Sequence, residues 1–340
     1  MFWPPVFLSV ATGTMLALPL VPSLTELHRR RDAAPLSTRS DDGKIENFAR
    51  SLREYMAPLV ERNGASSSRL RDGVEGRVLV QRDVPDLPET PIDAPVFAPS
   101  SIVIHIPICF SRELYVAGKL DIFSNSLLRA VLVEGDCTLG ERTSVARWIH
   151  VTGHLQADAD VQLYGRASAE ATITLARGCT FERLRALAIC TGTASKPLFN
   201  ESPVWKGSGL VDMRLGRVRS HGDFHLRDSD AFQGHIVAVG KVAIDDNVLV
   251  IGSIKARTDV EIGSGTHVEG TLVSRGHTRV GSHCYVKGPI LSEGEIVIGS
   301  GTQIGTPASP TTISAPRIRI APGAVICGSI WAREAGEVSA

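Results

Sequence analysis

The sequence predicts an all-β fold, a β-solenoid in which each coil is one repeat of an 18-residue period. The first observation is a set of apolar residues that recur with this period: Ile244, Ile262, Val280 and Ile298. The second is a column of glycines with the same step: Gly234, Gly252, Gly270 and Gly288. The third is composition, since 32 residues are glycine and only 5% are aromatic, which suits short strands and tight corners. Self-similarity at a fixed period is typical of solenoid proteins.

An 18-residue period divides into three faces of six residues. Apolar and polar residues alternate within each face, as a strand with one buried side requires. Stacked coils would then bury Ile on Ile and Val on Val, each contributing about 1.5–3 kcal/mol. The glycines would occupy the corners.

The repeat divides the chain into two blocks. The regular block covers residues 221–333, and an irregular block over 100–187 carries a weaker copy through Leu139, Ala157 and Leu175. Residues 188–220 separate them and are expected to form a loop insertion, since this stretch holds Pro197 and Pro203. Residues 334–340 form a short tail.

Residues 1–24 contain no charged side chain, and an apolar run of roughly 20 residues can cross a bilayer. Three arginines follow at Arg29, Arg30 and Arg31. Because the positive charge comes after the run, a single-pass transmembrane helix is expected, with the bulk of the chain in the cytoplasm.

Two segments are expected between this anchor and the solenoid. Residues 25–62 form a basic juxtamembrane stretch and an amphipathic helix, in which Phe48, Leu52 and Met56 recur at helical spacing. This helix would lie on the membrane surface or dock on the solenoid, and Pro58 is expected to end it. Residues 63–99 are rich in proline and predict a stiff, extended linker.

Charge and motifs exclude several function classes. Basic and acidic residues balance at 36 each, so nucleic acid is not an expected partner. The six cysteines are spread out, which favours free thiols over a disulfide framework or a zinc site. The histidines of His150/His154 and His221/His225 would lie ~13 Å apart on a strand, too far for one metal. No cofactor and no small-molecule substrate are expected.

The last coil suggests an assembly contact. A solenoid exposes unpaired backbone groups at each end, and the short remainder after Trp331 makes a poor cap. We therefore take Ile326, Ile330 and Trp331 as the candidate assembly contact. Replacing Ile326 or Ile330 by Asp is expected to abolish large assemblies without unfolding the rest of the chain.

One family resembles this chain. The stretch VLVIGSIKARTDVEIGSGTHVEGTLVSRGHTRVGSHCYVKGPILSEGEIVIG, with clear similarity over about residues 226–333, resembles the core of the bactofilins, bacterial polymer-forming cytoskeletal proteins. The resemblance implies a right-handed β-helix, head-to-head assembly into filaments without nucleotide, and association with the bacterial inner membrane through an N-terminal segment. Two blocks are a departure from that family, and the block at 100–187 would either cap one end or aid assembly.

Three functions follow as hypotheses. The first is a membrane-anchored, polymer-forming scaffold that self-associates and has no enzymatic activity. The alternative is a left-handed β-helix acyltransferase of the hexapeptide-repeat type, whose general base would be His267, His277 or His283. The second alternative is a membrane-tethered binding module that does not polymerise.

Overall fold

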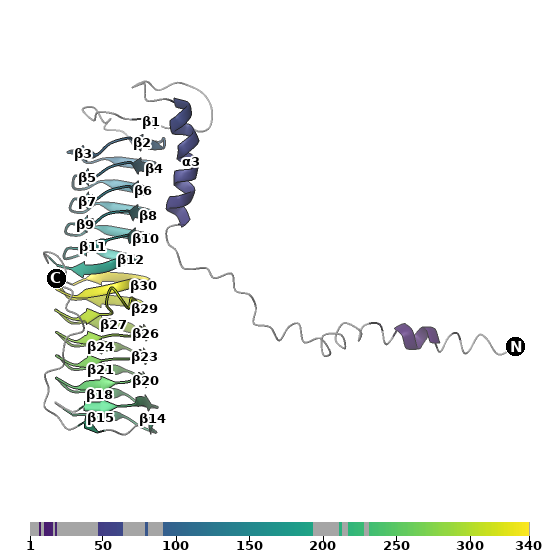
Figure 1. Cartoon of the computed structure of the whole chain (residues 1–340), viewed down its shortest axis with the longest axis vertical. Coiled ribbons are helices and arrows are strands. Elements are labelled where there is room, and N and C mark those ends of the chain that lie inside the picture. Colours follow the sequence, from purple (N-terminus) through teal and green to yellow (C-terminus); the bar gives the residue numbers. More distant parts are fainter. Residues whose placement is uncertain are drawn as a thin grey trace. The chain divides into compact units, whose positions relative to one another are not determined.

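The computed structural model describes residues 7, 10–15, 18, 47–63, 79–80, 91–192, 211–212, 217–227 and 231–339 (Figure 1). The chain divides into two units, Met1–Lys44 and Ile45–Ala340, which are treated separately below. The second unit contains a helix and one continuous hydrogen-bonded sheet wound into coils. The predicted β-solenoid is confirmed.

The first block of the solenoid runs from β2 to β12, and β1 pairs with its first strand. Its strands pair in parallel at or close to the predicted period, as in the ladder from Val131 to Ile149 to Ala167. The described strands are β1 (Leu79–Val80), β2 (Val96–Ala98), β3 (Ile102–Ile104), β4 (Cys109–Val116), β5 (Leu120–Ile122), β6 (Leu127–Val133), β7 (Cys137–Leu139), β8 (Ser144–Val151), β9 (Leu155–Ala157), β10 (Gln162–Ala169), β11 (Thr172–Leu175) and β12 (Thr180–Thr191).

The second block runs from β13 to β30 and has shorter strands, except in its last coil. The described strands are β13 (Val211–Asp212), β14 (Arg217–Ser220), β15 (Phe224–Leu226), β16 (Ala231–Gln233), β17 (His235–Ala238), β18 (Val242–Ile244), β19 (Leu249–Ile251), β20 (Ile254–Ala256), β21 (Val260–Ile262), β22 (His267–Val268), β23 (Leu272–Ser274), β24 (Thr278–Val280), β25 (Tyr285–Val286), β26 (Ile290–Ser292), β27 (Glu295–Ile298), β28 (Gln303–Ile304), β29 (Thr311–Ile320) and β30 (Val325–Val338).

Each coil of the second block has three faces. Face A consists of β14, β17, β20, β23, β26 and the first half of β29. Face B consists of β15, β18, β21, β24, β27 and the second half of β29. Face C consists of β13, β16, β19, β22, β25, β28 and the start of β30. In the first block, β3, β5, β7, β9 and β11 form the counterpart of face B, and β4, β6, β8 and β10 bend across the counterparts of faces C and A.

Like side chains stack through the core, as the repeat predicts. The 18-residue steps are strand pairs: Ile244, Ile262, Val280 and Ile298 form one ladder on face B. All four are buried. The weaker repeat of the first block is confirmed in the same way, by the ladder Leu139, Ala157 and Leu175.

In most of the described coils, the corner between faces B and C is closed by a residue with positive φ. In the first block these residues are Asn125, Arg142, Asp160 and Gly178, and in the second block Asn247, Gly265, His283, Gly301 and Gly323. The left-handed region strains L side chains, which explains why glycine and asparagine recur here. A Cβ on Gly301 would lie 2.7 Å from the His283 ring, so a side chain on one coil covers the glycine of the next.

Helix α3 (Asn47–Asn63) lies on the first block, where Ala49, Leu52 and Met56 are buried against Phe97 and Leu132. These three positions share one face of a helix. Of the two placements expected for the amphipathic helix, the structure has the one docked on the solenoid. The helix continues through Pro58, which was expected to end it, since proline can kink a helix without ending it.

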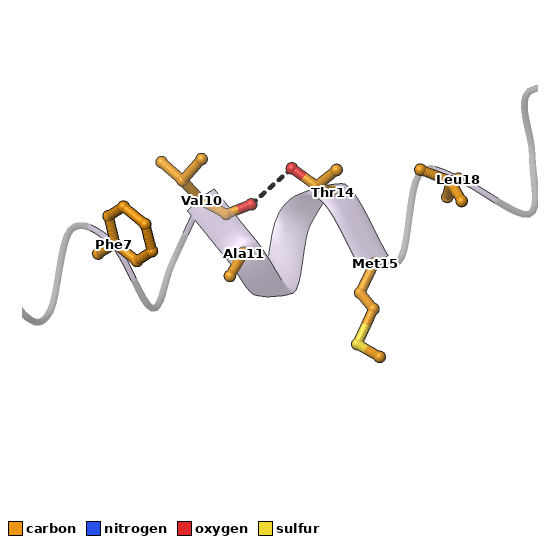
Figure 2. Close-up of a pocket in the computed structure, with 6 residues that line it drawn as sticks. All are labelled: Phe7, Val10, Ala11, Thr14, Met15 and Leu18. Carbon is orange, nitrogen blue, oxygen red and sulfur yellow. Dashed lines mark hydrogen bonds between the residues drawn. The ribbon is translucent and has the colours of Figure 1, made fainter.

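The described part of the first unit is a short helix over residues 10–15, in which the Thr14 hydroxyl donates to the Val10 carbonyl at 2.8 Å (Figure 2). Exposed apolar side chains, among them Phe7, Val10 and Met15, line a surface hollow along it. Among the described residues, no helix is both long and apolar enough to span a bilayer, so the transmembrane helix expected over 1–24 finds no support there. The rest of that segment lies outside the described residues.

Three predicted boundaries differ from the strands of the structure. Strands β1 and β2 lie inside the linker expected over 63–99, and Pro95 and Pro99 flank β2 without interrupting it. Strand β12 ends inside the insertion expected over 188–220, and β13 and β14 lie wholly within it, while 193–210 and 213–216 are outside the described residues. Strand β30 continues to Val338, through most of the expected tail.

Candidate assembly junction

The two blocks meet end to end where β12 pairs with β30, near the middle of Figure 1. This pairing is antiparallel, whereas the ladders within each block are parallel. Two solenoid blocks with parallel coils can join through an antiparallel pair of end strands only if both contribute their first coil or both contribute their last coil. The junction therefore joins the last coil of the first block to the last coil of the second.

The register of the junction has the form of a two-fold contact. Leu184 pairs with Ile330 in the centre, Ile189 pairs with Ile326 on one side, and Phe181 pairs with Gly336 on the other. In this pairing, face A of the second block meets the counterpart of face A in the first block. Face C of the second block meets the first block's counterpart of face B, and face B of the second block meets the first block's counterpart of face C. A two-fold axis through the centre would exchange the faces in this way, so the chain contains the equivalent of an isologous interface within one molecule.

Backbone and side-chain hydrogen bonds close both edges of the junction. At one edge, the amide of Thr191 donates to the Ala324 carbonyl at 3.1 Å, and the amide of Gly323 donates to the Thr191 carbonyl at 2.7 Å. The Thr191 hydroxyl also donates to the Ala321 carbonyl at 2.7 Å. At the other edge, the amide of Gly178 donates to the Val338 carbonyl at 3.0 Å. The edge strands β12 and β30 thus satisfy each other's backbone groups.

Two side-chain contacts give the junction its detailed fit. A Cβ on Gly336 would lie 2.1 Å from the Phe181 ring, so this pair requires glycine on β30. The guanidinium of Arg183 lies over the Trp331 ring, 4.6 Å from its centroid, which is a cation–π geometry. Both contacts join the first block to the second.

All three residues of the candidate assembly contact lie on β30 in this junction. Ile326 and Ile330 are buried, and Trp331 is 43% exposed. Their partners are residues of the same chain: Ile189, Leu184 and Arg183. The end that was expected to be uncapped is covered by β12, and a contact between two chains through these residues stays a prediction.

Sequence reasoning missed β12 as the partner of β30. The step of 51 residues from Leu175 to Leu226, three fewer than three full coils, could not indicate it, because a loop also shifts the phase within one parallel stack, as between Ile304 and Ile326. The alternation of Ile326, Ile330 and Val338 marks the final strand.

A second interface seats α3 on the first block. Arg53 donates from Nε and Nη2 to the two carboxylate oxygens of Glu134, at 2.5 and 2.9 Å, and the Tyr115 hydroxyl donates to Glu134 at 3.2 Å. The hydrogen bond from Arg53 holds the pKa of Glu134 below its ordinary value, while burial acts in the opposite direction. Burial, with the neighbouring Glu134 carboxylate, raises the pKa of Tyr115. Trp148 stacks on Phe48 with ring centroids 6.4 Å apart.

The three candidate bases of the acyltransferase alternative lie apart in the structure. His267 on face C is buried, with Nε2 2.6 Å from Glu269 Oε1 and its ring 4.5 Å from that of Tyr285. His277 accepts the amide of Glu295 at Nδ1, between neighbouring coils. His283 occupies the positive-φ corner. Only His267 has the carboxylate partner that orients a general base.

The cysteines of the described residues are all free, and Cys109 alone is not fully buried. Burial raises the pKa of Cys179, Cys190, Cys284 and Cys327 to about 11, and raises that of Cys137 further. These thiols stay protonated at neutral pH and fill the core as small apolar groups. The described residues contain no group of three or more side chains placed to bind a metal ion.

Comparison of the chain with family models, with curated proteins and with solved structures finds no match.

Proposed function

We propose that this chain is a self-assembling scaffold protein, which associates end to end by pairing the terminal coils of its solenoid and uses no nucleotide. The observation that carries the proposal is the β12–β30 junction. Coil ends of this sequence pair with each other through backbone hydrogen bonds and an apolar centre. The same chemistry is available wherever a coil end lacks a partner.

Because the junction uses both last coils, the first coils become the proposed contacts between copies. In the second block, β13, β14 and β15 each pair with one neighbour among the described strands: β16, β17 and β18. Val218, Phe224 and Leu226 of this coil pack on the core but stay partly exposed. In the first block, β3 pairs only with β5 among the described strands. These edges resemble the ones that β12 and β30 cover for each other.

Membrane anchoring belongs to the same proposal. The uncharged segment 1–24, followed by Arg29–Arg31, would tether the scaffold at the bacterial inner membrane, with the solenoid on the cytoplasmic side.

The test is sedimentation velocity of the full chain in detergent over a concentration series, with negative-stain microscopy of the same samples. The wild type is expected to form larger species as concentration rises. Leu226→Glu, in the first coil of the second block, should leave a monomer, and because Leu226 also packs on the core, thermal unfolding shows whether the solenoid stays folded. The matched control is Ile251→Glu, on the outside of an inner coil and 41% exposed, which should assemble like the wild type.

A monomer at every concentration would contradict assembly and favour the membrane-tethered binding module. A discrete trimer would favour the acyltransferase alternative, and binding of acyl-CoA with and without His267→Ala would then be measured.

A further inference from the structure

Basic side chains gather on the outer side of face A in the second block. Here the face is taken to include its strands and the first residue of the corner that follows each strand. Its outward positions include six exposed basic residues: Arg217, Arg219, Lys255, Arg257, Arg275 and Arg333. Among the described residues at these positions, one is acidic, Glu293. Two aspartates deeper in the corner, Asp223 and Asp259, accept backbone amides of the next coil. A chain with no net charge thus places a concentrated positive field on one face.

The charges on this face are not compensated locally. None of Lys255, Arg257 and Arg275 forms an ion pair with a described residue. On face B, by contrast, Lys241 pairs with Glu261, and Arg319 lies 2.8 Å from Glu295. These pairs cancel in the surrounding solvent, whereas Lys255, Arg257 and Arg275 on face A remain available to an anionic partner.

Apolar side chains alternate with these basic residues. Leu291 is 39% exposed, Val239 and Trp331 are each 43% exposed, and Val237 and Val273 are half-buried. The strands of face A pair in register, so Lys255, Val273 and Leu291 form one outward row along the sheet. The face is therefore a sheet surface of mixed basic and aliphatic character, with a tryptophan at the junction end.

We propose that face A of the second block binds the surface of an anionic lipid bilayer. Lysine and arginine bind acidic headgroups while their alkyl stems lie among apolar groups, and tryptophan is favoured at the membrane–water interface. Nucleic acid suits the face less well, because single strands are held by stacked aromatic side chains, and the residues between the charges here are valine and leucine. This contact is independent of end-to-end assembly and of the N-terminal segment.

The test is flotation of the full chain with vesicles of phosphatidylcholine alone and of an equal mixture with phosphatidylserine. The variant is Lys255→Glu/Arg257→Glu/Arg275→Glu. The control is Arg279→Glu/Lys287→Glu/Arg317→Glu, which has the same change of charge on other faces of the same block. The N-terminal tether proposed above acts on both kinds of vesicle, so the quantity compared is the preference for mixed vesicles over phosphatidylcholine vesicles. Each basic residue near an anionic surface contributes about a fivefold change in partitioning, so this preference should be on the order of a hundredfold smaller in the variant. The control should keep the preference of the wild type.

A second measurement separates face binding from tethering alone. Brominated lipids are expected to quench a part of the tryptophan fluorescence that Trp331→Phe removes. An equal preference for mixed vesicles in variant and control, no such preference in the wild type, or vesicle binding without quenching of Trp331 would each overturn the proposal. A loss of double-stranded DNA binding in the variant, with vesicle binding unchanged, would assign the face to nucleic acid instead. Thermal unfolding of both triple variants shows whether the fold is intact.

Discussion

The first block and the second block wind the same coil but turn its corners differently. In the second block, glycines such as Gly252 and Gly270 lie between faces C and A, and the strands on either side are two to four residues long. In the first block, residues such as Arg129 occupy that corner. There the strands β4, β6, β8 and β10 bend through it over seven or eight residues, with register shifts. In most coils of the second block the strand ends at the corner glycine, whereas in the first block the strands bend through the corner with a shift of register, even at Gly165 of β10.

The blocks also differ in what covers them. The outer side of the first block carries Leu132 and Trp148 and is covered by α3. The corresponding face of the second block carries unpaired basic residues and has no helix among the described residues. The same face of the solenoid thus packs against a helix in the first block and is exposed in the second block.

The largest expected effect comes from the junction, where the two blocks depend on each other. Ile330→Asp would place a charge in the buried centre opposite Leu184, and we expect a loss of about 3–5 kcal/mol in the free energy of unfolding. Urea unfolding should then show separate transitions for the two blocks. The matched control is Leu291→Asp, outward on the same face, with an expected change of about 0.5 kcal/mol or less. Equal losses in the two variants would contradict the junction.

A smaller effect is expected at the fit between Phe181 and Gly336. Gly336→Ala would bring a methyl group against the Phe181 ring and should cost about 1–3 kcal/mol. Phe181→Leu makes room, so the double variant should lose less than the sum of the two single variants. Gly222→Ala, where a Cβ would contact nothing within 4 Å, is the control. Additive losses in the double-mutant cycle would show that the two residues do not touch.

The contact between α3 and the first block tests the difference in what covers the two blocks. Arg53→Ala removes the ion pair with Glu134 and should cost about 1 kcal/mol or less, measured as faster amide exchange in α3. Because the pKa of Glu134 is lowered in the folded state, its contribution is present above the unfolded pKa and is lost as pH falls through the lower folded value. Protection of α3 should therefore fall in acid for the wild type, and less so for Arg53→Ala.

Arg50→Ala, at an exposed position of the same helix, is the control and should leave exchange unchanged. A pH dependence of the same size in Arg53→Ala would show that Glu134 is not its source.

The smallest effect is expected at the positive-φ corner, which occurs at equivalent positions in both blocks. Arg142 in the first block and His283 in the second have φ of 58° and 56°. Replacing either by glycine relieves left-handed strain and should stabilise the chain by about 1 kcal/mol or less. Arg279→Gly, within strand β24, should instead destabilise it by about 0.5–1 kcal/mol. Chemical denaturation checks all three. Stabilisation in only one block would mean that the corners are not equivalent.

The period, the core ladders and the amphipathic helix could be predicted from the sequence because each depends on local spacing. Ile244 and Ile262 bury one above the other, since stacked coils repeat the same environment once per period. Alternation within a strand and helical spacing in Leu52 and Met56 are likewise properties of neighbouring residues. The apolar side chains of Ile326 and Ile330 on the terminal strand indicated that this strand requires a cover, while a contact between copies through them stays a prediction.

Only the tertiary structure decided which strand covers the apolar side chains of β30. Ile189 and Ile326 pair across more than a hundred residues, and an antiparallel junction leaves no periodic pattern in the sequence, since it occurs once. The contact of α3 with the first block and the outer surface of face A have a similar origin: Arg53 and Glu134, or Lys255 and Val273, become neighbours only in the folded solenoid. Repetition along the chain determines what each coil is, whereas the contacts made once, between ends and faces, depend on how the completed coils meet.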